Sequence, residues 1–328
     1  MIELVAGLPA ALPAAVLIVQ HIPPHTTSNL AKVLRSRTPL EVRQAEQGDR
    51  LRAGVIYTAV ADRHLLVEEG RILLTNGPRE NRHRPCVDAL FRSVGYTYRG
   101  RAIGVILSGA LNDGASGMYT IKRFGGTSVI QSPAEAVFDS MPRSIQQYAD
   151  VDYELPAREI GPLLGKMARI SVATNHSAMD HSKNTALAEL DLRIARGENA
   201  LESGVIEMGR RSALTCPECH GALTEYQEGR LQRYRCHTGH AHTAESLLAS
   251  IDQGVENSMW EAMRGLEENK ILLDHLAQEL ERRGESEVAD SYRRRAATLA
   301  ERSQLFKEAI FAHQNSDVAE IGTPANAK

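Results

Sequence analysis

The sequence contains few cysteines, lacks any long apolar run and has no excess of basic residues. Four cysteines among 328 residues, three of them clustered late, suit a reduced compartment better than a disulfide framework. No apolar run reaches the ~20 residues of a membrane-spanning helix, and the N-terminal stretch lacks the basic region that begins a signal peptide. The formal net charge of −3 argues against nucleic-acid binding. These absences predict a cytoplasmic protein that is not inserted into a membrane.

Short apolar segments alternate with helix-like segments through the first half of the chain. Strands are expected at residues 14–20, 40–45, 55–59, 64–68, 72–75, 103–107, 127–131 and 151–155, and helices at 26–35, 87–98, 115–124, 142–148 and 159–170. The strands at 55–59, 64–68 and 72–75 are expected to form a small antiparallel insertion. The remaining alternation predicts an α/β fold with a mostly parallel, doubly wound sheet.

Two proton-active side chains follow strands of this expected sheet. His21 comes after the apolar run Ala14–Gln20, and Asp113 follows the run Ile103–Leu107 on a loop that leads into a helix. The carboxyl ends of parallel strands share one edge of a sheet, where ligands bind. Asp113 alone is read more readily as a helix cap, but a His and an Asp at one edge are two members of a Ser-His-Asp relay.

Four segments resemble, in order, segments of the bacterial chemotaxis protein-glutamate methylesterases. Ala14–Pro24, with the letters QHIPP, resembles their strand-to-loop segment, and Arg84–Phe91 resembles PSVDxLF. Ile106–Ala115 resembles LTGMGxDGA, and Gln131–Arg143 resembles the stretch that closes on MPR. Each match is weak alone, but four matches in order are specific.

The resemblance implies a carboxylic ester hydrolase that hydrolyses glutamate methyl esters on chemoreceptors and deamidates receptor glutamines. It implies that His21 is the general base and that Asp113 orients it. The family's nucleophilic serine lies on a turn after the first strand, upstream of the segment that matches Ile2–Leu8. We therefore expect the sheet to lack its first strand and the serine to lie outside this sequence.

Two positions depart from the family's motifs. Ala110 and Leu111 stand where the family has Met-Gly, near the backbone that stabilises its oxyanion, so the sequence leaves the geometry of this backbone open. Cys86 replaces the serine of the PSVD segment. Nothing in the sequence places Cys86 near His21, and we expect a small buried residue rather than a substitute nucleophile. His25, His64 and His83 are expected at the surface or the substrate face, without an assigned role.

The second candidate site is a set of soft metal ligands. Cys216 and Cys219 form a C-x2-C turn, and Cys236 and His240 follow after sixteen residues in a C-x3-H arrangement. This spacing predicts a zinc ribbon with a structural zinc ion, because all four tetrahedral positions are filled by protein. The fourth ligand remains open among His240, His237 and His242. No cofactor is expected for catalysis.

The expected organisation is a methylesterase-like α/β domain at 1–170, a linker and helix at 171–212, the zinc ribbon at 213–242, an α-helical hairpin at 243–314 and a disordered tail at 315–328. The expected partners are methyl-accepting chemoreceptors and other chemosensory proteins. Two other functions stay open. The chain could be a catalytically inactive zinc-containing adaptor, because the serine is outside the sequence, or a nucleic-acid module, against which its charge balance argues.

Overall fold

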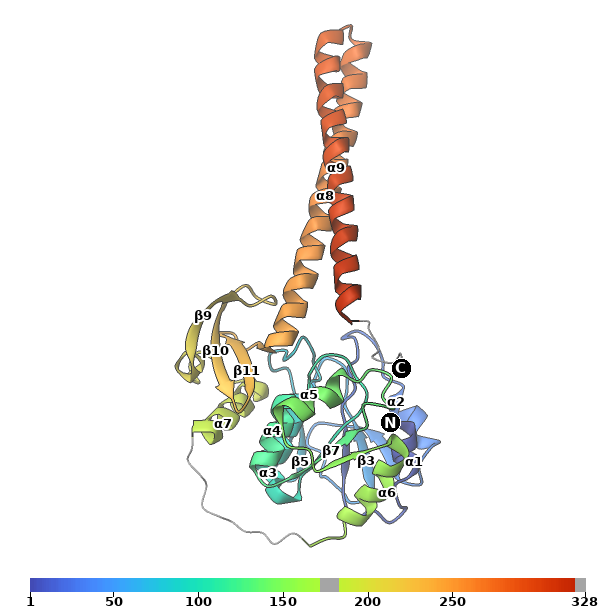
Figure 1. Ribbon diagram of the computed structural model, residues 1–328, viewed down its shortest axis with the longest axis vertical. Helices are drawn as coiled ribbons and strands as arrows, with labels where there is room; N and C mark the ends of the chain where they lie inside the picture. The colour runs from blue at the N-terminus through green and yellow to red at the C-terminus, as the bar shows by residue number, and fades with distance from the viewer. Residues whose placement is uncertain (172–182, 322–328) are drawn as a thin grey trace, which may run out of the picture. The chain divides into compact units, whose positions relative to one another are not determined.

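The computed structural model describes residues 1–171 and 183–321, and the chain divides into two compact units (Figure 1). The first unit spans Met1–Leu248 and holds both candidate sites. The second begins at Ala249. The segments 1–170 and 213–242, expected to be separate domains, therefore fall within one compact unit. None of the described helices has the length and apolar character of a membrane span.

Two three-stranded parallel sheets form the centre of the first unit. Their strands are β1 (Val16–Ile18), β2 (Glu41–Gln44) and β3 (Val55–Thr58), in the order β1-β3-β2, and β6 (Ile103–Ile106), β7 (Thr127–Gln131) and β8 (Tyr153–Leu155), in the order β6-β7-β8. The single sheet that we expected is thus observed as two, because no strand pair among the described residues joins β1 to β6. This break lies where the first strand was expected to be missing.

Helices cover both sides of these strands. They are α1 (Ile2–Ala6), α2 (Leu30–Arg35), α3 (Val87–Tyr98), α4 (Ala115–Arg123), α5 (Ser140–Tyr148) and α6 (Ala157–Met167). In Figure 1, α3 and α4 lie on one side of β3 and β7, and α1 and α6 lie on the other. Ile106 and Ile130 pack with the α3–α4 side, whereas Ile56 and Val129 pack with the α1–α6 side. Apolar side chains on both faces explain the nearly continuous apolar strands.

The antiparallel insertion is smaller than we expected. Strands β4 (His64–Glu68) and β5 (Arg71–Thr75) form an antiparallel hairpin, but β3 pairs in parallel with β1 and β2. The expectation that β3 belongs to the insertion is therefore wrong. His64 was expected at the surface, yet it is fully buried and its Nε2 lies 2.9 Å from the carbonyl oxygen of Pro78.

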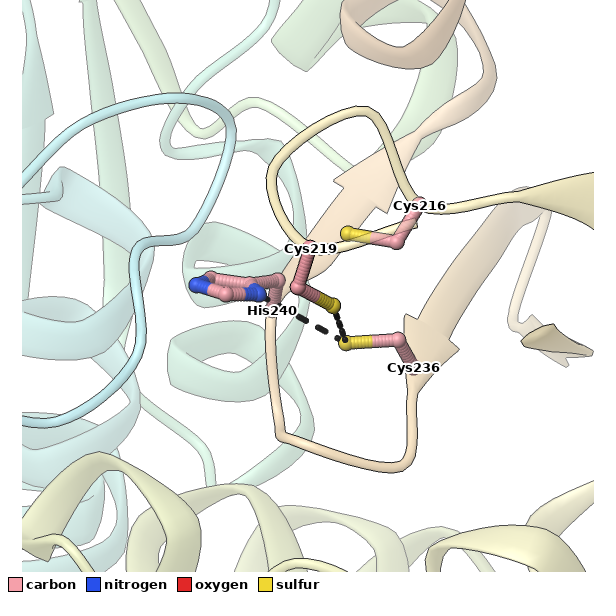
Figure 2. Close-up of side chains that lie close together, drawn as sticks. All are labelled: Cys216, Cys219, Cys236 and His240. Carbon is pink, nitrogen blue, oxygen red and sulfur yellow. Dashed lines mark hydrogen bonds between the residues drawn. The ribbon is translucent and has the colours of Figure 1, made fainter. Parts of the chain in front are cut away.

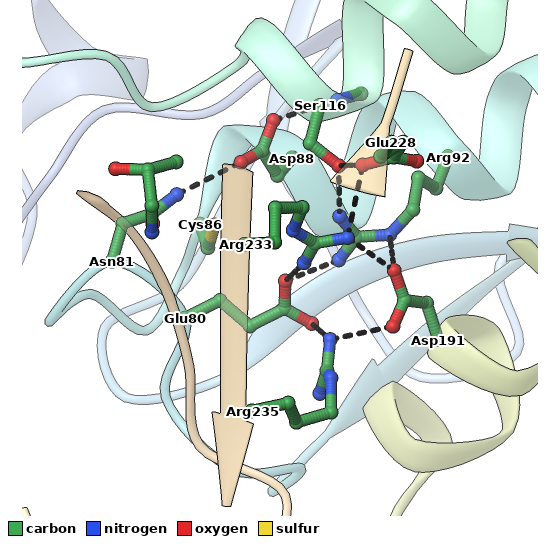
Figure 3. Close-up of polar contacts among 12 residues, drawn as sticks. Glu80, Asn81, Cys86, Asp88, Arg92, Ser116, Asp191, Glu228, Arg233 and Arg235 are labelled. Carbon is green, nitrogen blue, oxygen red and sulfur yellow. Dashed lines mark hydrogen bonds and ion pairs between the residues drawn. The ribbon is translucent and has the colours of Figure 1, made fainter. Parts of the chain in front are cut away.

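A four-stranded antiparallel sheet, here called the cysteine sheet, completes the first unit. It consists of β9 (Arg210–Thr215), β10 (Ala222–Glu228), β11 (Leu231–Cys236) and β12 (Ala241–Thr243), in the order β12-β11-β10-β9. Helix α7 (Lys183–Arg196) and the 3-10 helix η2 (Val205–Met208) precede it. Figure 3 shows a buried cluster of ionic side chains that joins this sheet to Glu80, which lies in a loop, and to helices α3 and α7.

The second unit contains most of α8 (Ala244–Arg282) and α9 (Ser286–Ile321), which run antiparallel (Figure 1). Gly284, with a φ of 81°, supplies the left-handed conformation in the turn between them. Ser303 donates a hydrogen bond of 3.2 Å to Glu267 across the pair. Helix α9 continues to Ile321, so the tail expected from Asn315 is helical up to that residue, and 322–328 lie outside the described residues.

Candidate active site and metal-binding site

The structure brings His21 and Asp113 into direct contact. His21 follows β1 and Asp113 follows β6, and the His21 Nε2 atom lies 2.7 Å from Oδ2 of Asp113. The Asp113 side chain is 2% exposed, whereas that of His21 is 27% exposed. Burial alone would lower the pKa of His21, but the hydrogen bond and negative charge of Asp113 outweigh it and raise that pKa above its usual value.

Several donors converge on the Asp113 carboxylate and keep it ionised. The backbone N–H groups of Val87 and Asp88 donate at 2.8 and 3.2 Å, the Cys86 thiol donates at 2.9 Å, and the Asn81 amide donates at 3.2 Å. Burial would raise the pKa of Asp113, but the histidine and these hydrogen bonds lower it well below its usual range. Asp113 is thus a fixed negative charge that can hold and stabilise a protonated imidazole.

Cys86 is buried, as expected, but it also belongs to the site. It is fully buried, and its thiol donates to Asp113 Oδ1. Burial and the nearby carboxylates raise the pKa of this thiol, so it remains protonated. A protonated thiol whose hydrogen is used by Asp113 is a poor nucleophile. The Cys86 thiol therefore supports the Asp113 carboxylate. It replaces the serine that the family has at this position by a hydrogen-bond donor of similar size.

His83 is a site residue that sequence reasoning left without a role. Its ring stacks on that of His21, with centroids 3.6 Å apart and planes 6° from parallel. Burial and the neighbouring His21 lower the pKa of His83 to about 4. A neutral ring therefore covers one face of His21 and restricts its rotation. Its place directly before the Arg84–Phe91 segment was the signal that could have identified it.

A cavity of about 1750 Å³ opens beside the pair. His21, His83 and Ser108 line it, together with residues of β1 and β6. Strand β1 is an edge strand of one parallel sheet, and strand β6 is an edge strand of the other. Because Nε2 of His21 faces Asp113, Nδ1 is left to exchange a proton with a group in this cavity. Among the residues that the structure describes, no hydrogen-bond partner of this Nδ1 is found.

Leu111, which stands where the family has glycine, has an unusual backbone conformation. Its φ of 60° lies in the left-handed region, which glycine adopts easily and a leucine adopts at a cost of roughly 1–2 kcal/mol. Leu111 lines the same cavity as His21. The backbone path is therefore the one a glycine would allow, maintained here with a side chain.

The predicted metal ligands also lie together (Figure 2). Donor atoms of Cys216, Cys219, Cys236 and His240 are all within 4.8 Å of one another. Cys219 Sγ lies 3.7 Å from Cys236 Sγ, and Cys236 Sγ lies 3.6 Å from His240 Nδ1. Bond lengths of about 2.3 Å to sulfur and 2.05 Å to nitrogen give tetrahedral edges of about 3.8 and 3.6 Å. These spacings fit a four-coordinate zinc ion.

Two tight turns present these ligands. The N–H of His220 donates to the carbonyl of Cys216 at 2.7 Å, and the N–H of Gly239 donates to the carbonyl of Cys236 at 2.9 Å. Among the alternative fourth ligands, His237 is exposed and outside the four-atom group. His242 is outside the group as well, with its Nε2 3.9 Å from Cys216 Sγ. The geometry therefore favours His240.

The fold and the first site define a parallel α/β protein in which a histidine after one strand is hydrogen-bonded to an aspartate after another. A family model described as CheB methylesterase matches residues 1–164, half of the chain, and the chain belongs to this family. The matched range contains His21 and Asp113 and ends before the cysteine sheet.

Curated relatives share this half. A protein-glutamate methylesterase/protein-glutamine glutaminase 2 of Methanosarcina acetivorans is 38% identical over 175 residues, which are 50% of this chain and 49% of that protein. A protein-glutamate methylesterase/protein-glutamine glutaminase of Symbiobacterium thermophilum is 40% identical over 159 residues, 48% and 44% of the two chains. The CheB methylesterase catalytic domain structure from Thermotoga maritima is 34% identical, with a TM-score of 0.48, and covers 51% of this chain and 90% of that one. The chain spans about half the length of these curated relatives.

Proposed function

We propose that this chain takes part in the hydrolysis of glutamate γ-methyl esters on chemoreceptors, with deamidation of glutamine as the related reaction. The observation that carries the proposal is the 2.7 Å contact between His21 Nε2 and Asp113 Oδ2, beside a cavity and within the range matched to the methylesterase family. His21 acts as general base and general acid, and Asp113 holds its tautomer and stabilises the imidazolium.

The reaction is an acyl transfer in two halves. A serine hydroxyl attacks the ester carbonyl while its proton passes to Nδ1 of His21, and the tetrahedral intermediate then collapses. Methanol leaves with that proton, so that an acyl-serine remains. A water molecule next attacks the acyl-serine, again giving its proton to His21, and the serine is regenerated with a free glutamate. The base must be neutral to begin, so the rate should rise with pH through the raised pKa of His21.

The cavity between the two sheets is where the serine would enter. Strands β1 and β6 each have one unpaired edge there. A strand parallel to both would satisfy these edges, and its carboxyl end would lie at the edge of the sheet that carries His21 and Asp113. The resemblance puts the family's serine on a turn after such a strand. We infer that a strand of this kind supplies the nucleophile to His21.

The activity test is methanol release from a methylated chemoreceptor fragment. The protein purified after expression from its own locus should release methanol, its His21→Ala variant should not, and His25→Ala, which changes an exposed histidine close in the sequence, should retain the wild-type rate. Turnover that survives His21→Ala would refute the proposed base. Absence of turnover in all three proteins would favour the adaptor function for this chain.

The intact mass of the protein expressed from its own locus tests the origin of the serine. A mass above that of this chain, by enough for a strand and a serine turn, would supply the missing member of the relay. A mass equal to that of this chain would leave His21 without a nucleophile from the same polypeptide, and the adaptor function would then be preferred.

We also propose one structural zinc ion held by Cys216, Cys219, Cys236 and His240. The fit of the donor spacings to a tetrahedron supports it, and four protein ligands leave no open position for catalysis. Metal analysis should find about one zinc per chain in the wild type and in Cys86→Ala, the matched control, and almost none in Cys216→Ala. A zinc-free wild-type protein would contradict this proposal.

A further inference from the structure

The loop Arg79–His83 connects the cysteine sheet to the His21–Asp113 pair. The N–H of Asn81 donates to the carbonyl of Ala241 at 2.8 Å, and the N–H of Ala241 donates to the carbonyl of Arg79 at 3.2 Å. The loop is thereby paired in parallel with β12, through the bridge between Glu80 and Ala241. Ala241 directly follows His240, so the paired backbone begins beside a candidate metal ligand.

The Asn81 side chain forms hydrogen bonds both to the end of the cysteine sheet and to the buried carboxylates beside His21. Its Nδ2 donates to Asp88 at 2.8 Å and to Asp113 at 3.2 Å. Its Oδ1 accepts from the N–H of Thr243 and from the hydroxyl of Ser246, both at 3.1 Å. A carboxamide has two donor hydrogens and two acceptor positions, so Asn81 is fully used. The orientation of the amide is fixed, because a backbone N–H can only donate.

Thr243 makes the second connection. It ends β12 and caps α8, since its Oγ1 accepts from the N–H of Ser246 at 3.1 Å. The same hydroxyl donates to Oδ1 of Asn112 at 2.7 Å. Asn112 immediately precedes Asp113, and Thr243 is fully buried. One residue of the cysteine sheet is therefore bonded to both loops that shape the His–Asp pair.

The other end of the loop reaches His21 itself. His83, whose N–H donates to the carbonyl of Glu80 at 2.9 Å, stacks on the His21 ring. The Glu80 carboxylate forms ion pairs with Arg235 of β11, at 3.3 Å, and with Arg92 of α3 (Figure 3). The loop cannot shift relative to the cysteine sheet without moving the ring that covers His21.

We propose that the metal-bound cysteine sheet positions the His21–Asp113 pair through Asn81 and Thr243, so that metal occupancy controls the geometry of the acid–base pair. The inference rests on the zinc site of the proposed function. The metal holds the turn from Cys236 to His240, and that turn sets where the three-residue strand β12 begins. Without it, Ala241 and Thr243 lose their fixed register, the Asn81 amide is released, and the stack of His83 on His21 opens. Asn81 and Thr243 are positioning residues.

The test reads the His21 ring by NMR in protein with ¹³C-labelled histidine, with His21 assigned from the spectrum of His21→Gln. A stacked neighbouring ring shifts the His21 Cε1–H resonance upfield. We expect this shift in the zinc-loaded protein and its loss when a chelator removes the zinc. Persistence of the shift in folded, zinc-free protein would overturn the proposal. Because the resonance needs no turnover, this outcome is independent of whether the chain hydrolyses esters.

Variants keep the proposal testable if the zinc-free protein unfolds. Asn81→Ala and Thr243→Val should lose the upfield shift while retaining about one zinc per chain. Thr243→Ser, which keeps the hydroxyl, should restore it. Thr224→Val is the matched control, because Thr224 is also buried but lies on β10, which does not pair with β12. A wild-type shift in both Asn81→Ala and Thr243→Val would refute the positioning role, and a wild-type protein that binds no zinc would remove its metal basis.

Discussion

His21 Nε2 and Asp113 Oδ2 lie 2.7 Å apart although 92 positions separate the two residues in the sequence. The contact forms because β1 and β6 are edge strands of the two parallel sheets and line one cavity. The two groups shift each other's pKa in opposite directions, with that of Asp113 lowered and that of His21 raised. Both shifts favour the charged forms, and both can be measured.

Replacing Asp113 by Asn should lower the pKa of His21. Burial lowers this pKa, and the hydrogen bond and charge of Asp113 are the largest contributions that raise it. Removing the charge of Asp113 leaves only the charge of Asp88 to oppose burial, so we expect the pKa of His21 to fall. An NMR titration of the labelled His21 ring measures it. An unchanged His21 pKa would show that Asp113 does not govern it.

The pair should contribute most to stability in mildly acidic solution. The pKa of Asp113 is depressed on folding, so its contribution is present above the unfolded value of about 3.9 and is lost as the pH falls further. The pKa of His21 is raised, so its contribution is present below about 6.5 and is lost as the pH rises through the folded value. The stability lost in Asp113→Asn should therefore be larger at pH 5.5 than at pH 9 in urea unfolding. A loss independent of pH would contradict this linkage.

Replacing Leu111 by Gly should give a more stable protein than replacing it by Ala. Both changes remove the same side chain, but only Gly relieves the backbone held at a φ of 60°. In an ordinary helix or strand Gly is less stable than Ala by roughly 0.5–1 kcal/mol. Here the order should reverse by about 1 kcal/mol, which urea unfolding of the two variants measures. The usual order would indicate that the backbone relaxes when the leucine is removed.

Much of the fold could be predicted because its signals are local. Helix α3 (Val87–Tyr98) and strand β7 (Thr127–Gln131) begin and end at the expected residues, since the apolar period of each is clear. Strand β3 was assigned to the wrong sheet because an apolar run does not encode its pairing partner. Two further strands follow Val55–Thr58 closely, which favoured a local hairpin, and only the tertiary structure shows the parallel pairing with β1 and β2.

The site residues could be predicted only where a reactive side chain follows an apolar strand or where ligands recur at a fixed spacing. His21 and Asp113 each follow an apolar run, so their shared edge could be inferred. Asn81 and His83 lie in a charged loop, and their contacts depend on how that loop meets the cysteine sheet. Thr243 was expected only as the first residue of the helical hairpin. Its bond to Asn112 joins residues 131 positions apart, and no local pattern encodes such a contact.

The buried ionic cluster should be sensitive to the loss of one arginine. Arg235 is fully buried between Glu80, at 3.3 Å, and Asp191, at 2.8 Å (Figure 3). Arg235→Met leaves these carboxylates with too little positive charge in a low-dielectric interior, so we expect a loss of about 3–5 kcal/mol. Arg230→Met, at an exposed position in the turn between β10 and β11, should cost no more than about 0.5 kcal/mol. Urea unfolding with saturating zinc measures both. Equal effects would mean that the cluster is solvated.

The second unit offers a test between adjacent leucines. Along α8 less exposed positions recur at 252, 256, 259, 263, 266, 270, 273, 277 and 280, alternating steps of four and three as in a coiled-coil seam, and position 274 beside them is also partly buried. Leu273 lies in this seam and is 4% exposed, whereas Leu272 is 58% exposed. Leu273→Ala should therefore cost about 2–5 kcal/mol through lost burial and a cavity, and Leu272→Ala no more than about 0.5 kcal/mol. Hydrogen exchange of the α8 and α9 amides measures the local free energy of opening. Similar losses for the two leucines would show that the helices do not pack along this seam.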